Sequence, residues 1–285
     1  SRFGVTQLED AGLFRIKLLP FRREQVIRFI REFLIKEPSL SCDVIEHLER
    51  NPAMFSVAKT PLMSTILCIL AQNGVVLPET KSALYKERFE LLWGAYDAKK
   101  QIRRINSSKA CLEDVSKKAA YYLHSYRIRS ALRENIHDYV QESLARKYKQ
   151  EVIRVALKEL ERPCNVLFEE IDGTIGFGHL SYQEYLVSDE LYTNRSSDIV
   201  EHFTDSWWRG VLVLAAMKVE DIGSIIEQRI INARDIGAAE ETLQAMIEVS
   251  NPSQKNVLSN LLSNQKNLDH IVDSYSDEDF DDPYS

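Results

Sequence analysis

Apolar residues recur at helical spacing along most of the chain. A first stripe at i, i+3, i+4, i+7 and i+8 consists of Val26, Phe29, Ile30, Phe33 and Leu34. The arginines around this stripe predict a solvated opposite face. Further helices are predicted over 43–50 and 61–72, where Pro61 takes a first-turn position that proline tolerates and Gly74 lies just beyond the end. These patterns predict a small helical domain.

Two other patterns flank that domain. The apolar run from Leu13 to Leu19 ends at Pro20-Phe21 and predicts a buried strand before a helix start. A later stripe at helical spacing consists of Tyr85, Phe89, Leu92, Trp93 and Tyr96. Aromatic residues in this arrangement are interpreted as core packing.

From Ser108 onward the order of predicted elements is that of a winged helix. A helix is followed by a short strand over Ser130–Leu132, two more helices and a hairpin. The hairpin joins Val166–Ile171 to Ile175–Phe177 through Asp172-Gly173, a dipeptide that favours a type I′ turn. The second long helix is expected at 151–162.

A helix start is predicted directly after the hairpin. Ser181-Tyr182-Gln183-Glu184 has the spacing of a capping box, and Leu180 and Tyr185 are placed to form a hydrophobic staple. His179 is therefore expected at the mouth of a helix, where free N–H groups and the helix dipole favour an anion such as phosphate. The alternative interpretation is a structural histidine bonded to a nearby carbonyl.

Helical patterns continue past Tyr192 over 207–215, 222–231, 238–249 and 253–272, and they predict the first turns of an α-superhelix. Residues 273–285 contain six acidic residues and no basic one, which predicts a disordered tail. The expected fold is therefore mostly α with a few short strands. Its predicted parts are a terminal strand (1–20), a helical domain (21–100), a winged helix (101–193), a superhelical segment (194–272) and the acidic tail (273–285).

Composition and motifs narrow the functional classes. The chain has 285 residues, of which 44% are hydrophobic and 28% charged, as in ordinary globular proteins. Its cysteines, Cys42, Cys68, Cys111 and Cys164, lie far apart and are expected to be reduced core thiols, with no metal site. No apolar run reaches the ~20 residues of a membrane span. A cytoplasmic protein without membrane contact is predicted.

Winged helices often bind DNA, so that function is the first alternative. The expected second long helix carries Arg154, Lys158 and Arg162, but also Glu151, Glu159 and Glu161. The whole chain has a net charge of −7, whereas a surface that follows phosphates needs a clear positive field. Nucleic-acid binding is therefore not expected.

The segment Phe177–Leu186 resembles the F-x-H-x-[ST]-[FY]-Q-E-[FY]-L motif of NACHT-type STAND NTPases, the class of the NOD-like receptors and related bacterial antiphage proteins. The resemblance implies that His179 contacts the β-phosphate of ADP. Thr60-Pro61-Leu62 resembles the motif whose proline packs on adenine. Ser1-Arg2 resembles the end of a T-S-R sensor segment, which makes Arg2 a third nucleotide-binding candidate and implies that the chain begins inside a nucleotide-binding domain.

The resemblance covers about 1–208 and implies an ADP/ATP-gated signalling switch, active in antiphage or innate-type defence. The sequence contains no G-x-x-x-x-G-K-[ST] loop and no strand ending in paired carboxylates, so this chain alone is not expected to be an enzyme or to hold a cofactor. The parent protein would be an NTPase that binds ATP with Mg²⁺ in a core that precedes this chain.

The partners implied are that nucleotide-binding core, further copies of the protein on activation, and an unidentified ligand at the superhelix. Two alternatives stay open: a winged-helix transcription regulator with a helical dimerisation region, and a helical protein-interaction scaffold.

Overall fold

The computed structural model describes residues 19–94, 105–194, 202–218, 222, 226 and 237–263. The described chain is mostly helical with a few short strands, which confirms the predicted fold class. It divides into two compact units, residues 1–88 and 89–285, and each is described by itself. The predicted strand over Leu13–Leu19 lies outside the described residues except for Leu19, which is exposed and not in a strand.

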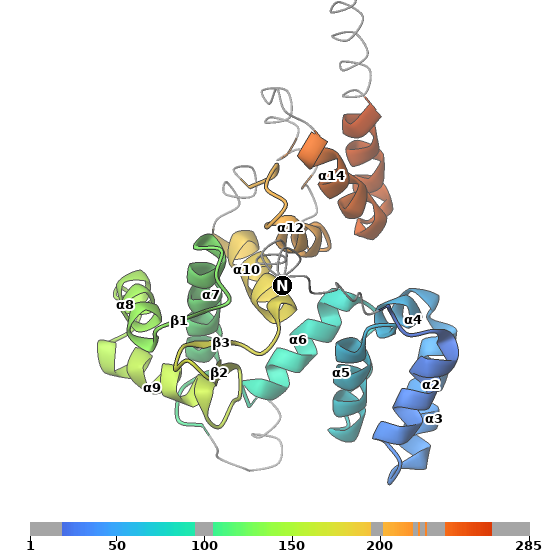
Figure 1. The fold of residues 1–285 in the computed structure, drawn as a ribbon, viewed down its shortest axis with the longest axis horizontal. Helices are drawn as coiled ribbons and strands as arrows, with labels where there is room; N and C mark the ends of the chain where they lie inside the picture. The colour runs from blue at the N-terminus through green and yellow to red at the C-terminus, as the bar shows by residue number, and fades with distance from the viewer. Residues whose placement is uncertain are drawn as a thin grey trace, which may run out of the picture. The chain divides into compact units, whose positions relative to one another are not determined.

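The first unit is a group of short helices around one apolar core (Figure 1). Its helices are α2 (Arg23–Phe33), α3 (Pro38–Arg50), α4 (Pro52–Ala58) and α5 (Pro61–Gln72). The most deeply buried side chains include Val26, Ile30, Val44, Ile66 and Leu67. Burial of this apolar surface is the main force that holds such short helices together, because each is marginal alone.

Local signals explain where these helices begin and end. The Asn51 side chain accepts a hydrogen bond from Met54 N (3.0 Å) and so caps α4. Pro61 is the first residue of α5, and Gly74 follows its end with φ of +67°, a conformation that glycine adopts without strain. Two expectations were wrong: Phe33 is 39% exposed rather than in the core, and Cys42 is exposed, unlike the other three cysteines.

Helix α6 (Lys81–Leu92) runs across the division between the units at Arg88. Its predicted aromatic stripe is largely confirmed, because Tyr85, Phe89 and Trp93 are buried. Leu92 is only half-buried, and Tyr96 lies outside the described residues. In the second unit, the Phe89 ring stacks on Tyr185 with centroids 5.5 Å apart, so the end of α6 is anchored by aromatic packing.

The second unit contains the predicted winged-helix order. The elements are α7 (Lys109–Ser125), β1 (Ser130–Ala131), α8 (Arg133–Leu144), α9 (Gln150–Glu161), β2 (Leu167–Glu169) and β3 (Ile175–Phe177). The strands form an antiparallel sheet in the order β1-β3-β2. Ser108 caps α7, and that helix packs against α8 and α9 as well as against the helix that follows the hairpin (Figure 1).

The hairpin turn differs from the prediction. Asp172 does not have a positive φ, whereas Gly173 does, at +79°. Glu170 N bonds to Thr174 O (2.8 Å) and Gly173 N to Glu170 O (3.0 Å), which is the pattern of a type I turn followed by a left-handed glycine. The type I′ turn was therefore wrong: the Asp-Gly dipeptide also fits this longer loop, and the strand register selects it.

Helices follow the hairpin in the same unit. They are α10 (Leu180–Asn194), α12 (Arg209–Ala216), α14 (Gly237–Val249) and a helix at 252–263. The helices predicted over 207–215 and 238–249 are confirmed, and the one over 253–272 is confirmed as far as residue 263. The tail and most of 222–231 lie outside the described residues. The superhelix and the domain boundaries stay predictions.

The close approach of β1 and β3 yields a test of the sheet. A Cβ at Gly176 would clash with the carbonyl oxygen of Arg129, a backbone atom that cannot move alone. Gly176→Ala should therefore lower the free energy of unfolding by about 1–3 kcal/mol, measured by urea denaturation. Gly173→Asn is the control, because no atom lies within 4 Å of that Cβ and asparagine tolerates a positive φ. Equal stability of the two variants would contradict this account.

Candidate functional site

The junction of β3 and α10 places His179 at the mouth of a helix, as predicted, but by a different mechanism. Helix α10 begins at Leu180, so His179 itself occupies the N-cap position. Its Nδ1 atom accepts a hydrogen bond from Ser181 N (3.0 Å). His179 therefore satisfies one of the N–H groups at the helix start, a role more often taken by Ser, Thr, Asp or Asn.

The predicted capping box was wrong. Ser181 lies inside the helix, and its N–H is bonded to His179, while Tyr182 N bonds to His179 O (3.0 Å). Glu184 does not reach back to the helix start. Its carboxylate instead lies so close to Gly210 of α12 that a Cβ there would clash with it. The helix therefore begins two residues earlier than the capping box predicts. Gly178 lies directly before the cap, where a Cβ would come within 3.0 Å of the Phe168 ring.

The hydrogen bond at Nδ1 determines the chemistry of the His179 ring. Because Nδ1 accepts, the proton of the neutral ring resides on Nε2, which is a donor on an exposed residue. Neighbouring atoms partly shield this ring from water and Arg129 adds positive charge, and both effects lower the pKa of His179. The ring is thus a neutral N–H donor at the positive end of α10, with a cation nearby.

Arg129 is a residue that sequence reasoning missed. It precedes β1, and the pairing of β1 with β3 brings it near the start of α10. In the described part of the chain, Arg129 forms no ion pair with a carboxylate. No local pattern signals this neighbour, because Arg129 and His179 meet only through the register of the sheet.

The other two predicted nucleotide contacts lie outside the unit that contains His179 or outside the described residues. Pro61 is exposed at the first position of α5 in the first unit, while His179 belongs to the second unit. Arg2 lies outside the described residues. Within the described ranges no group of three His, Cys, Asp or Glu side chains is placed to hold a metal ion.

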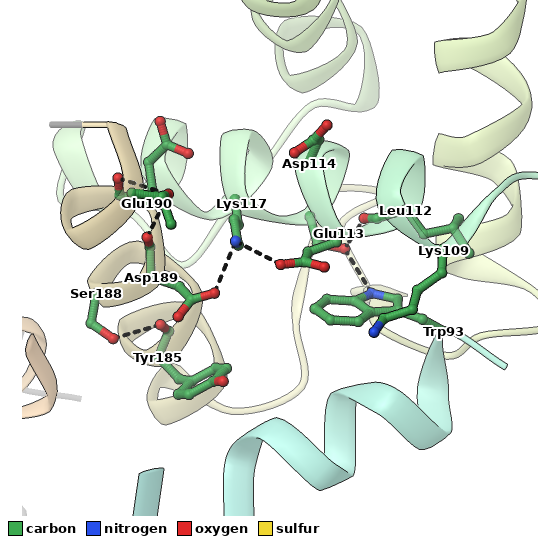
Figure 2. A network of polar contacts seen from close by, with 12 residues as sticks. Trp93, Lys109, Leu112, Glu113, Asp114, Lys117, Tyr185, Ser188, Asp189 and Glu190 are labelled. Carbon is green, nitrogen blue, oxygen red and sulfur yellow. Dashed lines mark hydrogen bonds and ion pairs between the residues drawn. The ribbon is translucent and has the colours of Figure 1, made fainter. Parts of the chain in front are cut away.

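A second polar cluster lies further along α10, and we call it the Asp189 cluster: Glu113, Lys117, Ser188, Asp189 and Lys218. Asp189 Oδ2 lies 2.9 Å from Lys117 Nζ, and its Oδ1 lies 2.8 Å from Lys218 Nζ. Figure 2 shows Lys117 of α7 between Glu113 and Asp189. One carboxylate therefore joins α10 to α7 and to the residue that follows the end of α12.

The two lysines of this cluster are largely removed from water. The side chains of Lys117 and Lys218 are 7% and 12% exposed, against 22% for Asp189. Burial alone would raise the pKa of Asp189, but the charges of Lys218 and Lys117 outweigh it and lower this pKa. Lys218 also donates to Ser188 Oγ (3.0 Å) and lies 4.0 Å from the centre of the Tyr185 ring, a cation–π contact.

Only one contact of the Asp189 cluster could be predicted from the sequence. The i, i+4 spacing of Glu113 and Lys117 is readable on a predicted helix, whereas the contacts of Asp189 join segments far apart in the sequence. Ser188 lies beside Lys218 in this cluster, but its hydroxyl is fully buried and donates to Tyr185 O (2.7 Å). The contacts of the cluster therefore join three segments of the chain.

Neither the protein-family models nor the curated proteins compared with this sequence match it. Across the described ranges, no single helix is long and apolar enough to cross a membrane, although α4 and α5 pass that test as a pair bent by 113°. The residues at the start of α10 and their geometry therefore carry the functional proposal.

The Asp189 cluster predicts a large effect of a small substitution. Asp189→Asn keeps the shape but leaves Lys117 and Lys218 without their shared carboxylate, so the free energy of unfolding should fall by about 3 kcal/mol, the lower end for breaking a buried pair. Thermal or urea denaturation measures this loss. Glu32→Gln is the control, since the Arg28–Glu32 pair is exposed to water and its loss should leave the free energy of unfolding nearly unchanged.

The Asp189 cluster also predicts how the folding stability changes with pH. Because the pKa of Asp189 is lower in the folded chain, the unfolded chain binds its proton first as pH falls. The contribution of Asp189 is complete above about pH 4 and declines below it. Asp189→Asn should remove that part of the acid sensitivity, and an unchanged acid profile would contradict the assignment.

Proposed function

We propose that the chain is the regulatory part of a NACHT-type STAND NTPase and acts in a nucleotide-gated signalling switch. The observation that carries this proposal is the fixed orientation of the His179 ring. Its Nδ1 bonds to Ser181 N, so Nε2–H is the group available to an anion at the start of α10. The segment whose sequence resembles the family motif is the segment that forms this junction.

The proposed mechanism uses the junction as a latch. The β-phosphate of ADP, held by the core that precedes this chain, would accept a hydrogen bond from His179 Nε2–H. Arg129 would add positive charge on the same side. A phosphate favours such a helix start because of its partial positive charge. Loss of this contact would free the winged helix, permit self-association and transmit binding of a ligand at the C-terminal helices to a defence response.

The charges on α9 favour this role over DNA binding. Arg154 forms a bidentate pair with Glu151, with bonds of 3.0 and 2.7 Å. Arg133 of α8 pairs in the same way with Glu161, with bonds of 2.9 and 2.7 Å. These two arginines, which could otherwise follow a phosphate backbone, are thus engaged with carboxylates. Salt-sensitive retardation of duplex DNA in an electrophoretic assay would favour a transcription regulator instead.

This chain alone should bind ADP weakly. One N–H donor and one cation replace only a small part of what a phosphate-binding loop provides, so we expect a dissociation constant no tighter than about 1 mM. Isothermal calorimetry measures this value. Micromolar affinity would show that the chain holds a complete nucleotide site and would contradict the proposal.

The latch itself is tested by His179→Asn in a protein that includes the nucleotide-binding core. Asparagine is a good N-cap residue and can accept the Ser181 N–H bond, but it lacks Nε2–H. Loss of one hydrogen bond to a charged phosphate costs about 1.5–3 kcal/mol, which is about 10- to 150-fold in the closed-to-open equilibrium. We expect more self-association without ligand, measured by light scattering, at an unchanged melting temperature.

His179→Ala separates the two roles of the residue. It removes both the cap and the donor, so it should raise self-association and also lower the stability by about 0.5–2 kcal/mol. The latch hypothesis fails if His179→Asn remains monomeric and as stable as the wild type. In that case the histidine would serve only as a helix cap.

A further inference from the structure

The last turn of α7 contains a second unusual histidine, far from the latch in the sequence. The His124 ring is completely buried. The Trp207 ring stacks on it with centroids 4.9 Å apart, and the Trp208 ring meets it edge-on at 4.6 Å. We call His124, Gln183, Trp207 and Trp208 the His124 pocket. Both tryptophans belong to the segment 202–208, which leads into α12.

Hydrogen bonds permit only a neutral ring in this pocket. The amide nitrogen of Gln183 donates to His124 Nδ1 and to Ile128 O, both at 3.3 Å, so both of its hydrogens are used. Nδ1 must therefore accept, and the proton of the neutral ring resides on Nε2. Nε2 is buried and has no hydrogen-bond partner. A second proton on Nδ1 would face the donor of Gln183 with no acceptor.

The surrounding charges act in the same direction. His202 and Arg127, just past the end of α7, both oppose a positive charge on His124, and Asp205 is paired with Arg127 at 2.5 Å. From α10, the group that bonds to the ring is the uncharged Gln183. Burial is the largest influence, and together with these charges it lowers the pKa of His124 to about 3. The closed pocket thus excludes a proton that water-exposed histidine accepts near pH 6.5.

Side-chain contacts join the tryptophan segment to the end of α7. Trp207 Nε1 donates to the backbone oxygen of His124 (2.9 Å), and Arg127, just past the end of α7, pairs with Asp205 on the same segment. His202 stacks on the other ring, Trp208, with centroids 3.6 Å apart. Because both tryptophan rings lie directly on the His124 ring, displacement of this segment would admit water and a proton.

We propose that the His124 pocket is an acid-operated lock, in which protonation of His124 releases residues 202–208 from the end of α7. The lock does not depend on nucleotide, so it can be tested independently of the proposed latch at His179. Its physiological stimulus would be a fall in pH, and its output would be exposure of Trp207 and Trp208 and detachment of the segment that leads to the C-terminal helices.

Proton linkage sets the size of the effect. When only the open form binds the proton, the opening equilibrium rises about tenfold for each pH unit below 6.5, down to the pKa of the closed form. Between pH 7.5 and pH 5.0 the expected increase is about 30-fold. At pH 5.0 ordinary aspartates remain ionised, so this range isolates histidine titration.

Hydrogen exchange of the whole chain, corrected for intrinsic rates, tests the lock. Protection of amides in 202–208 should fall about 30-fold from pH 7.5 to 5.0, while amides in the middle of α8 keep theirs. His124→Phe retains an aromatic ring that can stack but cannot titrate, so its protection should not depend on pH. His137→Gln, on α8, is the matched control and should respond as the wild type does.

Two further measurements test the proposal, including the case in which His124→Phe does not fold. His202→Gln should retain the pH response, because His202 stacks on Trp208 and not on the buried ring. If His124→Phe does not fold, nitrogen-15 NMR of the wild type should show His124 neutral with its proton on Nε2 at pH 5.0 in the closed form. The lock is refuted if protection of 202–208 is independent of pH, if the response persists in His124→Phe, or if His124 titrates near pH 6.5 in the closed form.

Discussion

The Asp189 carboxylate is largely withdrawn from water, and it keeps its charge because two lysines accompany it. Its charge is stabilised by Lys117 from α7 and by Lys218 beyond α12, both of which are largely buried. Neither lysine can leave without exposing the other charges to a poorly solvating interior. The position of α10 is therefore fixed at its C-terminal half by charge pairing, and the rest of the second unit is arranged around that helix.

Three different interactions of the second unit are made by residues of helix α10 and its cap. At its start His179 caps the helix, one turn later Gln183 fixes the proton of His124, and near its end Asp189 joins the lysines. Because these groups share one rigid helix, a rotation that disturbs one contact changes the geometry of the others. This arrangement gives the proposed latch a physical route to the C-terminal helices.

Local physics made most of the fold predictable. The apolar stripes identified the helices because amphipathic spacing is a property of each segment alone, and Ser108 and Pro61 marked two of their starts. The hairpin turn and the N-cap of α10 were less predictable. Asp172-Gly173 fits two turn types, and either His179 or Ser181 could be the N-cap residue. In the structure, strand register selects the turn and His179 is the cap.

The candidate site was predictable only at His179. Arg129 joins it through the sheet, and the Asp189 cluster joins segments separated by tens of residues, for which a single sequence carries no local signal. Pro61 stays a prediction from resemblance, because it lies in the other unit.

Because Trp207 Nε1 bonds to the His124 carbonyl, the winged helix can reach its final packing only after residues that follow it have been synthesised. This bond links residues 83 positions apart, and it completes the end of α7 from outside the predicted boundary at 193. A nascent chain that has emerged only to α10 would contain every strand of the sheet, yet His124 would lack its cover and Asp189 would lack Lys218. The ribosome must therefore deliver the residues up to Lys218 before this domain can reach its final packing.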